Sequence, residues 1–357
     1  MNPFKNKNVL VTGHTGFKGS WLTAWLHMLG ANITAISKDV PTMPAHYDLL
    51  KSFIQNDITE DITNYSQVYK IIKDCKPNYI FHLAAQPIVL TSYENPYLTF
   101  QSNSIGTLNI LESLRVINPS CTAVIITSDK CYENLEKRIK YKENDRLGGK
   151  DPYSASKASA EIMIKAYCES FFKKPNSNIR LASSRAGNVI GGGDWARYRI
   201  IPDCIRAWSS NRKAEIRNSK STRPWQHILE PLSGYLTLAY HLDISESLNG
   251  ESFNFGPDSN VEHSVGDLVN EVAKQWINAK WTDATEESDK LYEANLLNLD
   301  CDKALDKLNW KPSLGFEETS AWTGKWYNIF YNESKESAMK ITQEQIEEYS
   351  GFLKLFQ

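Results

Sequence analysis

The feature that most constrains the fold of this 357-residue chain is a glycine turn between a short apolar strand and an amphipathic helix. The strand-forming run NVLVT occupies residues 8–12, and apolar residues then recur at helical spacing through Leu29. Strand, turn and helix together are the context that a dinucleotide fingerprint requires, although the spacing here is G-x-x-G-x-x-G and a simple structural turn is the alternative. Glycines let the backbone approach a pyrophosphate, and the N–H groups of the first helical turn point at its charge. We therefore predict a dinucleotide cofactor held by Gly13, Thr15, Gly16, Phe17, Lys18 and Gly19.

Strand-like and helix-like patterns alternate regularly after this turn. Such alternation predicts an α/β fold, a doubly wound parallel sheet of Rossmann type, with a smaller C-terminal substrate-binding domain. We expect the Rossmann domain to span residues 1–183 and about 223–250, and the second domain to span 184–222 and 251–357. The predicted elements are strands at 8–12, 31–36, 79–83, 121–126 and 179–185, and long helices at 95–115 and 153–171.

Composition excludes several classes of protein. Forty Lys and Arg residues oppose forty-two Asp and Glu residues, and a net charge of −2 without a long basic run gives no footprint for nucleic acid. No apolar stretch reaches the length of a membrane span. The six cysteines are scattered without a C-x-x-C pair, so we expect reduced thiols in a cytoplasmic protein and neither disulfides nor a metal site.

The adenosine end of the predicted cofactor site is less well defined. The second strand ends at Ser37, where an acidic side chain would bind the adenine ribose of NAD. Asp39 is the nearest acid and Lys38 would suit a 2′-phosphate, so this edge leaves NAD and NADP both open. Asp61 and Ile62 are candidates to cap the adenine, although residues 57–58 repeat the same Asp-Ile pair and leave the register open.

Two polar residues in otherwise apolar elements have structural interpretations. We expect His82 to be a core histidine bonded to a neighbour. Asn103, on the apolar face of a helix, is expected to bond a backbone group and to fix a bend or a water near the site. The small residues that follow the 79–82 strand let a flat cofactor lie against the backbone, and the residues concerned are Leu83, Ala84 and Ala85.

The polar residues at positions 127–130 are the candidate chemical centre. They follow the buried run at 121–126, and ligands in open parallel sheets bind outside the carboxyl ends of the strands. Ser128, Asp129 and Lys130 supply a hydroxyl, a carboxylate and an amine there, although a helix cap and surface turn would use similar residues. Tyr153 and Lys157 lie one helical turn apart, and an ammonium beside a phenol, with a cationic nicotinamide nearby, favours the phenolate and lowers the pKa of the tyrosine.

Together, the glycine turn, the Leu83–Gln86 segment and Tyr153-x-x-x-Lys157 resemble the extended short-chain dehydrogenase/reductase family. Within it, four motifs resemble the CDP-glucose 4,6-dehydratase subfamily, and the likeness runs to about Pro312. They lie at residues 12–22 (TGHTGFKGSWL), 127–132 (TSDKCY), 185–195 (RAGNVIGGGDW) and 223–227 (RPWQH). The dTDP-glucose dehydratases carry Asp-Glu where this chain has Asp129-Lys130, and the glucose 4-epimerases lack this acid/base pair.

The resemblance implies a cytoplasmic, NAD-dependent lyase of deoxysugar and O-antigen biosynthesis, with CDP-glucose as its small-molecule substrate. It implies a homodimer that pairs through the helices at 95–115 and 153–171. Asn188 and Arg223 would bind the substrate diphosphate, because amide donors and a planar guanidinium suit phosphate oxygens. The full set of implied substrate-binding residues is Gln86, Asn188, Arg197 and Arg223.

The implied reaction is a redox-neutral dehydration. Tyr153 removes the proton of the sugar 4-OH with help from Ser128, and Lys157 supports Tyr153 and holds the cofactor ribose. Lys130, or a group that it positions, removes the C5 proton, and a protonated Asp129 gives a proton to the departing 6-OH, although these two roles could be exchanged. Another nucleotide-sugar dehydratase, a 4-epimerase or a non-catalytic cofactor-binding protein of the same fold are the alternatives.

Overall fold

A seven-stranded parallel sheet forms the centre of the molecule in the computed structural model, which describes residues 2–137, 139–258, 263–284 and 297–353. The strand order is β12-β7-β5-β4-β1-β2-β3. This confirms the predicted doubly wound α/β fold. The strands are β1 (Asn8–Thr12), β2 (Asn32–Ser37), β3 (Asn56–Thr59), β4 (Tyr79–His82), β5 (Cys121–Ile126), β7 (Ile179–Ala186) and β12 (Ser252–Phe255).

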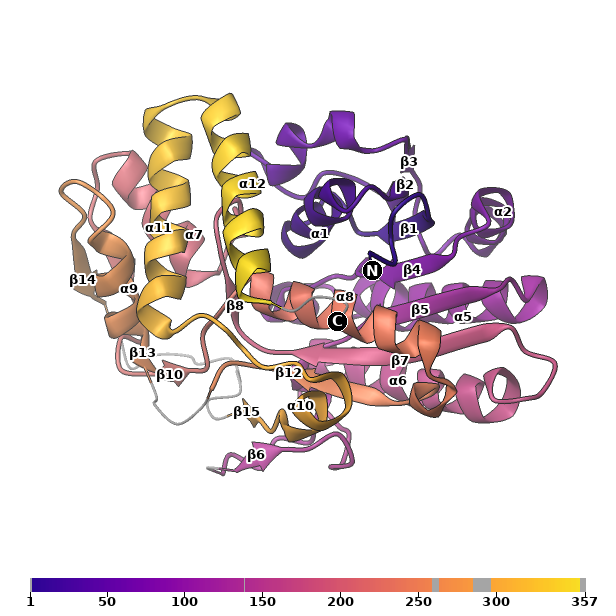
Figure 1. Cartoon of the computed structure of the whole chain (residues 1–357). Coiled ribbons are helices and arrows are strands. Elements are labelled where there is room, and N and C mark those ends of the chain that lie inside the picture. The colour runs from indigo at the N-terminus through magenta and orange to yellow at the C-terminus, as the bar shows by residue number, and fades with distance from the viewer. Residues whose placement is uncertain (1, 138, 259–262, 285–296, 354–357) are drawn as a thin grey trace.

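Helices cover both faces of this sheet (Figure 1). In β1, Val9 and Val11 face one hydrophobic core and Leu10 faces the other, as expected for a parallel strand that is buried on both sides. The first core is covered by α1 (Phe17–Met28) and α8 (Leu229–Ile244), and the second by α2 (Tyr65–Cys75), α5 (Gly106–Ile117) and α6 (Pro152–Tyr167). The carboxyl ends of all seven strands consequently meet at one edge.

The helix predicted at 95–115 is interrupted. It consists of α4 (Pro96–Phe100), a π-helical turn at Gln101–Ile105, and α5. Asn103 lies in the π turn, where its side chain accepts from the backbone N–H of Gln86 (2.8 Å) and donates to the carbonyl of Gln86 (3.1 Å) and to Ser156 Oγ (2.9 Å). The predicted bend at Asn103 is therefore confirmed, and it ties the end of β4 to α6.

His82 is the core histidine that we predicted. Its ring nitrogens bond Thr12 Oγ1 at 2.7 Å and Thr107 Oγ1 at 3.1 Å. Burial lowers the pKa of His82 to about 3, so the imidazole stays neutral. It thus bridges β1 and α5 and carries no charge into the site.

The second, smaller part of the chain lies beside α1 and α8 and contains α7 (Ile200–Ser209), α9 (Val265–Ala273), α11 (Phe316–Asn332) and α12 (Lys335–Phe352) (Figure 1). Its predicted boundary at residue 251 needs correction, because residues 252–255 complete the main sheet as β12. The C-terminal helix α12 packs against α1. The remaining elements are α3 (Val89–Glu94), α10 (Asp302–Leu308), β6 (Lys140–Tyr141), β8 (Val189–Ile190), β9 (Ala214–Ile216), β10 (Thr222–Arg223), β11 (Gln226–His227), β13 (His263–Ser264), β14 (Trp281–Asp283) and β15 (Asn298–Leu299).

A buried carboxylate joins the two parts of the chain. Glu230 of α8 accepts from the backbone N–H groups of Ser313 (2.9 Å) and Leu314 (2.7 Å), and from the hydroxyl of Tyr349 in α12 (2.6 Å). Burial raises the pKa of Glu230 to about 7. Burial therefore outweighs the three hydrogen bonds, each of which favours the ionised carboxylate.

This junction predicts a pH effect on stability. The pKa of Glu230 in the folded protein lies above its unfolded value, so the folded state holds more protons and loses stability as pH rises from about 5 through 7. Glu230→Gln mimics the protonated acid. We expect it to reduce the pH-dependent loss of unfolding free energy by up to about 3 kcal/mol. Thermal melts between about pH 5 and pH 8 measure the effect, with the exposed Glu317→Gln as the matched control. Equal pH dependence in both variants would contradict this assignment.

Candidate active site

The glycine turn packs tightly against the end of β4. Gly13 has φ +78°, and a Cβ there would lie 2.6 Å from the backbone nitrogen of Ala84. A Cβ on Gly19 would lie 2.1 Å from the carbonyl oxygen of Gly13. Gly16, the residue before helix α1, provides no side-chain cap, and the first turn of the helix contains no acid. Its N-terminal N–H groups are consequently suited to an anion, as a dinucleotide pyrophosphate requires.

Two of the predicted cofactor residues serve mainly to shape this turn. Ser37 Oγ accepts from the backbone N–H of Thr15 (3.3 Å), and Thr15 Oγ1 donates to the carbonyl of Asp39 (2.7 Å). Ser37 Oγ also bonds Nδ1 of His14 at 3.0 Å, and Nε2 of His14 bonds Asp57 at 3.0 Å. The side chains of Thr15 and Ser37 are therefore committed to the chain itself, and Asp57 acts as a support for the turn.

At the predicted adenine end, the two candidate residues face different ways. The Asp61 carboxylate caps the backbone N–H of Thr63 at 2.9 Å and remains partly exposed. The side chain of Ile62 is buried against Gly106, where a Cβ would lie 2.4 Å from Ile62 Cδ1. The Ile62 side chain thus belongs to the core, and its carbonyl accepts from the Asn109 side chain at 2.9 Å. Leu83, Ala84 and Ala85 follow β4 directly and are half-buried beside Gly13.

The predicted catalytic groups meet at the carboxyl end of β5. Ser128 Oγ donates to Asp129 Oδ1 at 2.8 Å and also hydrogen-bonds the hydroxyl of Tyr153. All three residues are buried. Burial raises the pKa of Asp129 despite the opposing charges of Lys130 and Lys18. The cluster therefore brings together a phenol, a shared hydroxyl and a carboxyl group whose pKa is raised by burial.

The protein alone does not lower the pKa of Tyr153, and the lowering that we expect also involves a cationic nicotinamide nearby. Burial raises the pKa of Tyr153 to about 12, and the Ser128 hydrogen bond opposes this only in part. Lys157 lies one turn further along α6 and donates to the carbonyl of Ile126 at 3.4 Å. Its own pKa is lowered to about 8 by burial. Desolvation outweighs the local charges here, so a phenolate needs further positive charge at the site.

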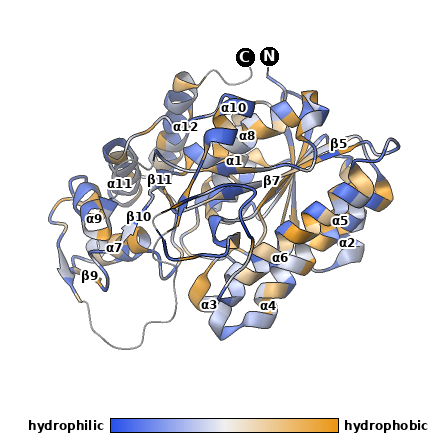
Figure 2. Cartoon of the chain, turned by 90° about the horizontal axis from the view of Figure 1, so that it is seen from below, coloured by the Kyte–Doolittle hydropathy of each residue, from blue (hydrophilic) through white to orange (hydrophobic). Residues whose placement is uncertain are grey.

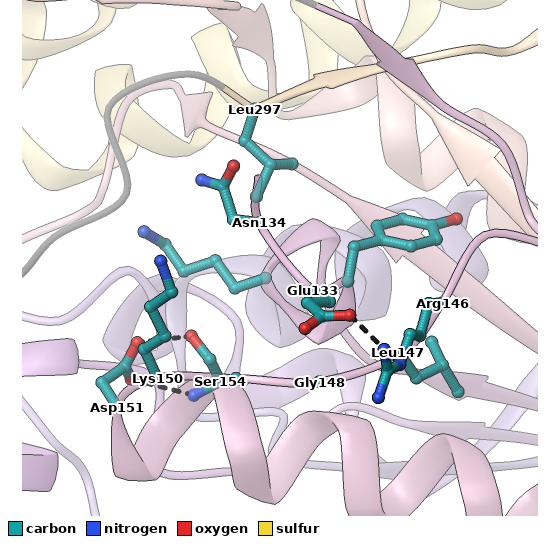
Figure 3. A pocket seen from close by; sticks show the side chains of 12 residues that line it. Glu133, Asn134, Arg146, Leu147, Gly148, Lys150, Asp151, Ser154 and Leu297 are labelled. Carbon is teal, nitrogen blue, oxygen red and sulfur yellow. Dashed lines mark hydrogen bonds and ion pairs between the residues drawn. The ribbon is translucent and has the colours of Figure 1, made fainter. Parts of the chain in front are cut away.

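Lys130 lines a cavity of about 180 Å³ between residues 130–134 and the segment 146–154 (Figure 3). In this view Lys150 and Asp151 stand on one wall and the ion pair between Glu133 and Arg146 on the other. Lys130 is thus one of the residues that line this cavity, and its proposed contact with substrate stays a prediction. Among the described residues, no group of three or more His, Cys, Asp or Glu side chains could hold a metal ion.

Two further cations approach the same centre. Lys18 extends from the first turn of α1, and burial and the charge of Arg199 lower its pKa to about 8, while Asp129 opposes the shift. Arg199 precedes α7 and pairs with the buried Asp194 at 2.7 Å, and its charge also acts on Tyr153. From the sequence we predicted Lys18 only as a cofactor-binding residue, and we did not predict a role for Arg199. The available sequence signal was Asp194, an acid five residues before Arg199 at the start of a helix. This spacing alone does not favour Arg199 over Arg197.

The four predicted substrate-binding residues differ in how far they are free to bind. The side-chain amide of Gln86 bonds Ile88 and Thr99 Oγ1 (2.9 Å), so it holds its own loop. Asn188 is half-buried at the start of β8, and Arg223 is half-buried in β10 and donates to the carbonyl of Thr222. Arg197 is exposed. Arg199, two residues further along, pairs with the buried Asp194, and the binding role of Arg197 stays a prediction.

Comparisons with known proteins show which families and structures the chain is similar to. A family model described as GDP-mannose 4,6 dehydratase matches residues 10–322. The chain is 42% identical over 337 residues to the CDP-glucose 4,6-dehydratase of Salmonella typhimurium, with 92% of each chain covered. An epimerase of Methanothermobacter thermautotrophicus has a similar structure (TM-score 0.77, 22% identity, 97% and 96% of the two chains covered). So does the dTDP-glucose 4,6-dehydratase of Bacillus anthracis in complex with NAD (TM-score 0.74, 21% identity, 93% and 99% covered).

Proposed function

This chain belongs to the GDP-mannose 4,6-dehydratase family of extended short-chain dehydrogenases/reductases, and from this we propose that it converts CDP-glucose to CDP-4-keto-6-deoxyglucose with NAD as cofactor. One observation carries the proposal. Ser128, Asp129 and Tyr153 converge at the end of β5 in a chain that is 42% identical to a CDP-glucose 4,6-dehydratase. The uncapped N-terminus of α1 and the close glycine turn fit the pyrophosphate of the cofactor.

The first step is oxidation at C4 of the sugar. Bound NAD supplies a hydride acceptor and a positive ring. Tyr153 takes the proton of the 4-OH, and Ser128, which hydrogen-bonds the phenol, shares the bond to that oxygen. Lys157 adds a cation on the same helix face. Because the chain alone raises the pKa of Tyr153 to about 12, we propose that this tyrosine acts as a base only in the cofactor complex.

The second step is the loss of water across C5 and C6. The C4 ketone acidifies the C5 proton, which is why oxidation must come first. Burial raises the pKa of Asp129, and we assign to it the proton that is donated to the departing 6-OH. We assign removal of the C5 proton to Lys130, at the wall of the adjoining cavity. At C6 a hydride, which the bound cofactor would supply, takes the place of the lost 6-OH, and a proton returns to C5.

A direct assay tests this function. The purified chain with NAD⁺ is incubated with a panel of nucleoside diphosphate glucoses, and the 4-keto-6-deoxy product is followed by its alkaline absorbance. We expect ketone from CDP-glucose in preference to the dTDP, UDP and GDP analogues. Formation of the C4 epimer without ketone would instead identify an epimerase, and no turnover of any sugar would identify a binding protein.

The cation beside Tyr153 predicts which arginine binds the substrate. We propose that Arg199, drawn to the site by its ion pair with Asp194, contacts the substrate diphosphate. Arg199→Met is expected to raise KM for CDP-glucose by about tenfold or more, whereas the exposed Arg197→Met should change it by less than about twofold. Steady-state kinetics on both variants, with melting temperatures as a check of folding, make the comparison. A larger effect at Arg197 would reverse the assignment.

We also propose that the protein forms a homodimer through α4, α5 and α6, which lie side by side (Figure 2). Large apolar side chains are exposed along these helices and the π turns that join or extend them. A second copy would bury them and remove apolar area from water. They are Tyr97, Leu98, Phe100, Ile105, Val116, Ile162 and Phe171.

A single charge should disrupt this interface. Ile162 is 59% exposed on α6, and Ile162→Glu would bury a carboxylate between two copies. We expect this variant to be monomeric in light scattering after gel filtration, at concentrations where the parent chain is a dimer. Ile277→Glu, at an 84% exposed position outside these helices, is the control and should not change the mass. A monomeric parent chain would rule out the dimer.

Among the described residues, no helix is both long and apolar enough to cross a membrane.

A further inference from the structure

A buried ion pair lies directly beneath the catalytic residues. Glu161 of α6 and Arg185 of β7 pair at 2.6 Å, and their side chains are only 2% and 3% exposed. Neither residue belongs to the glycine turn, the acid/base cluster or the proposed diphosphate site. A fully desolvated ion pair often stabilises a fold no more than an apolar pair of the same size would. This pair is therefore a candidate for a further role.

Glu161 holds the end of the catalytic strand. Its Oε1 accepts from the hydroxyl of Thr127 at 2.5 Å, and Thr127 immediately precedes Ser128. Its Oε2 accepts from Ser183 Oγ at 2.9 Å, from Arg185 Nη2 at 2.6 Å and from Ser252 Oγ at 3.3 Å. One carboxylate therefore fixes three neighbouring strands, β5, β7 and β12, at the edge where the chemistry takes place.

Arg185 extends this contact to the next segment of the site. It donates to the hydroxyl of Tyr132 at 2.8 Å and to the carbonyl of Glu143 at 3.0 Å, and its guanidinium lies over the Tyr132 ring. Residues 128–132 are thereby held from both ends, by Thr127 and by Tyr132. The position of Asp129 and Lys130 depends on this double attachment.

Glu161 also lies one helical turn beyond Lys157, on the same face of α6. Its charge favours the ammonium form of Lys157, against the burial that lowers the pKa of this lysine. The other groups that face Lys157 do not supply such a charge. Lys18 of α1 is a cation, His82 of β4 is held neutral by burial, and burial raises the pKa of the Cys131 thiol so that it stays uncharged.

We propose that Glu161 is a positioning residue of the dehydration reaction, which anchors the Thr127–Asp129 strand end and keeps the proton on Lys157. Arg185 balances the charge of Glu161 and holds Tyr132. The inference rests on the proposed function for its kinetic test, and it deepens that function by naming what sets the protonation of the lysine.

The test separates charge from packing with two glutamine substitutions. Glu161→Gln keeps a hydrogen-bonding shape but leaves Arg185 unpaired, so it is expected to melt at a lower temperature. The double variant Glu161→Gln/Arg185→Gln restores a neutral, hydrogen-bonded pair and is expected to regain part of that stability. The rate of CDP-glucose turnover is then measured against pH for the parent chain, Glu161→Gln, Arg185→Gln and the double variant.

We expect the alkaline limb of the pH profile to move to lower pH by about one unit in Glu161→Gln and in the double variant, and not in Arg185→Gln. The alkaline limb is assigned to loss of the proton on Lys157. If the double variant regains both its stability and the parent pH profile, Glu161 is only a structural residue and the proposal is wrong.

A second readout does not depend on activity. Titration of ¹³C-labelled lysine by NMR, with the Lys157 signal identified by its loss in Lys157→Met, follows this amine directly. A Lys157 pKa that is unchanged in the double variant would overturn the proposal even if CDP-glucose is not the substrate. A lowered pKa together with no turnover of CDP-glucose by the parent chain would instead contradict the proposed function alone.

Discussion

Tyr153→Phe is expected to lower kcat for CDP-glucose by about 10²–10⁴-fold, because it removes the proton acceptor for the 4-OH while leaving the ring in place. The hydroxyl of Tyr153 is bonded to Ser128 at the end of β5, and no other phenol shares that bond in the described residues. Oxidation is the first step, so both the reduced cofactor and the ketone should fail to appear. Stopped-flow absorbance of the nicotinamide and the alkaline ketone assay measure the two outcomes.

Tyr65→Phe is the matched control, since Tyr65 is an exposed tyrosine on α2. It should keep the activity and the melting temperature of the parent chain. If Tyr153→Phe kept more than about a tenth of the parent kcat, the proton would have to leave by another group, and the acid/base assignment at β5 would fail.

Asp129→Asn and Lys130→Ala are each expected to lower overall turnover by about 10²-fold or more while permitting oxidation at C4. The reason is that both residues act after the ketone has formed. Reduced cofactor should therefore accumulate with CDP-glucose, and the 6-deoxy product should not.

Exchange in D₂O distinguishes the two roles. If Lys130 removes the C5 proton, Lys130→Ala blocks the incorporation of deuterium at C5, whereas Asp129→Asn permits it and blocks only the departure of the 6-OH. The reverse pattern would mean that the acid and the base are exchanged. Asp306→Asn and Lys307→Ala, at exposed positions on α10, are the matched controls and should behave as the parent chain does.

The fold could be predicted because its signals are local. The run at residues 8–12, the close-packed glycines and the apolar strands at 79–82 and 121–126 each specify their own conformation, and the parallel sheet follows from their alternation. Strand β12 was missed because Ser252–Phe255 is a four-residue run, too short for its pattern to show whether it joins the main sheet or the second domain. That information lies in its pairing with β7.

The candidate site was predictable where two residues lie on one helix face or follow one strand, as Tyr153 and Lys157 or Ser128 and Asp129 do. It was not predictable where tertiary packing decides the direction of a side chain. Arg197 and Arg199 are two residues apart, and only the buried Asp194 shows which of them turns inward. The same holds for Ile62, whose side chain packs against Gly106 in the core. It also holds for Glu161 of α6, whose partner Arg185 lies on strand β7.

The packing of α12 against α1 has a consequence for how this polypeptide matures. Trp25 in α1 meets the ring of Tyr349, and the ring of His46 bonds Thr342 Oγ1, so these partners lie far apart in the sequence. Because synthesis runs from the N-terminus, the contacts between α1 and α12 can form only after α12 has left the ribosome. The aromatic side chains of α1 therefore lack these partners while the intervening chain is being made.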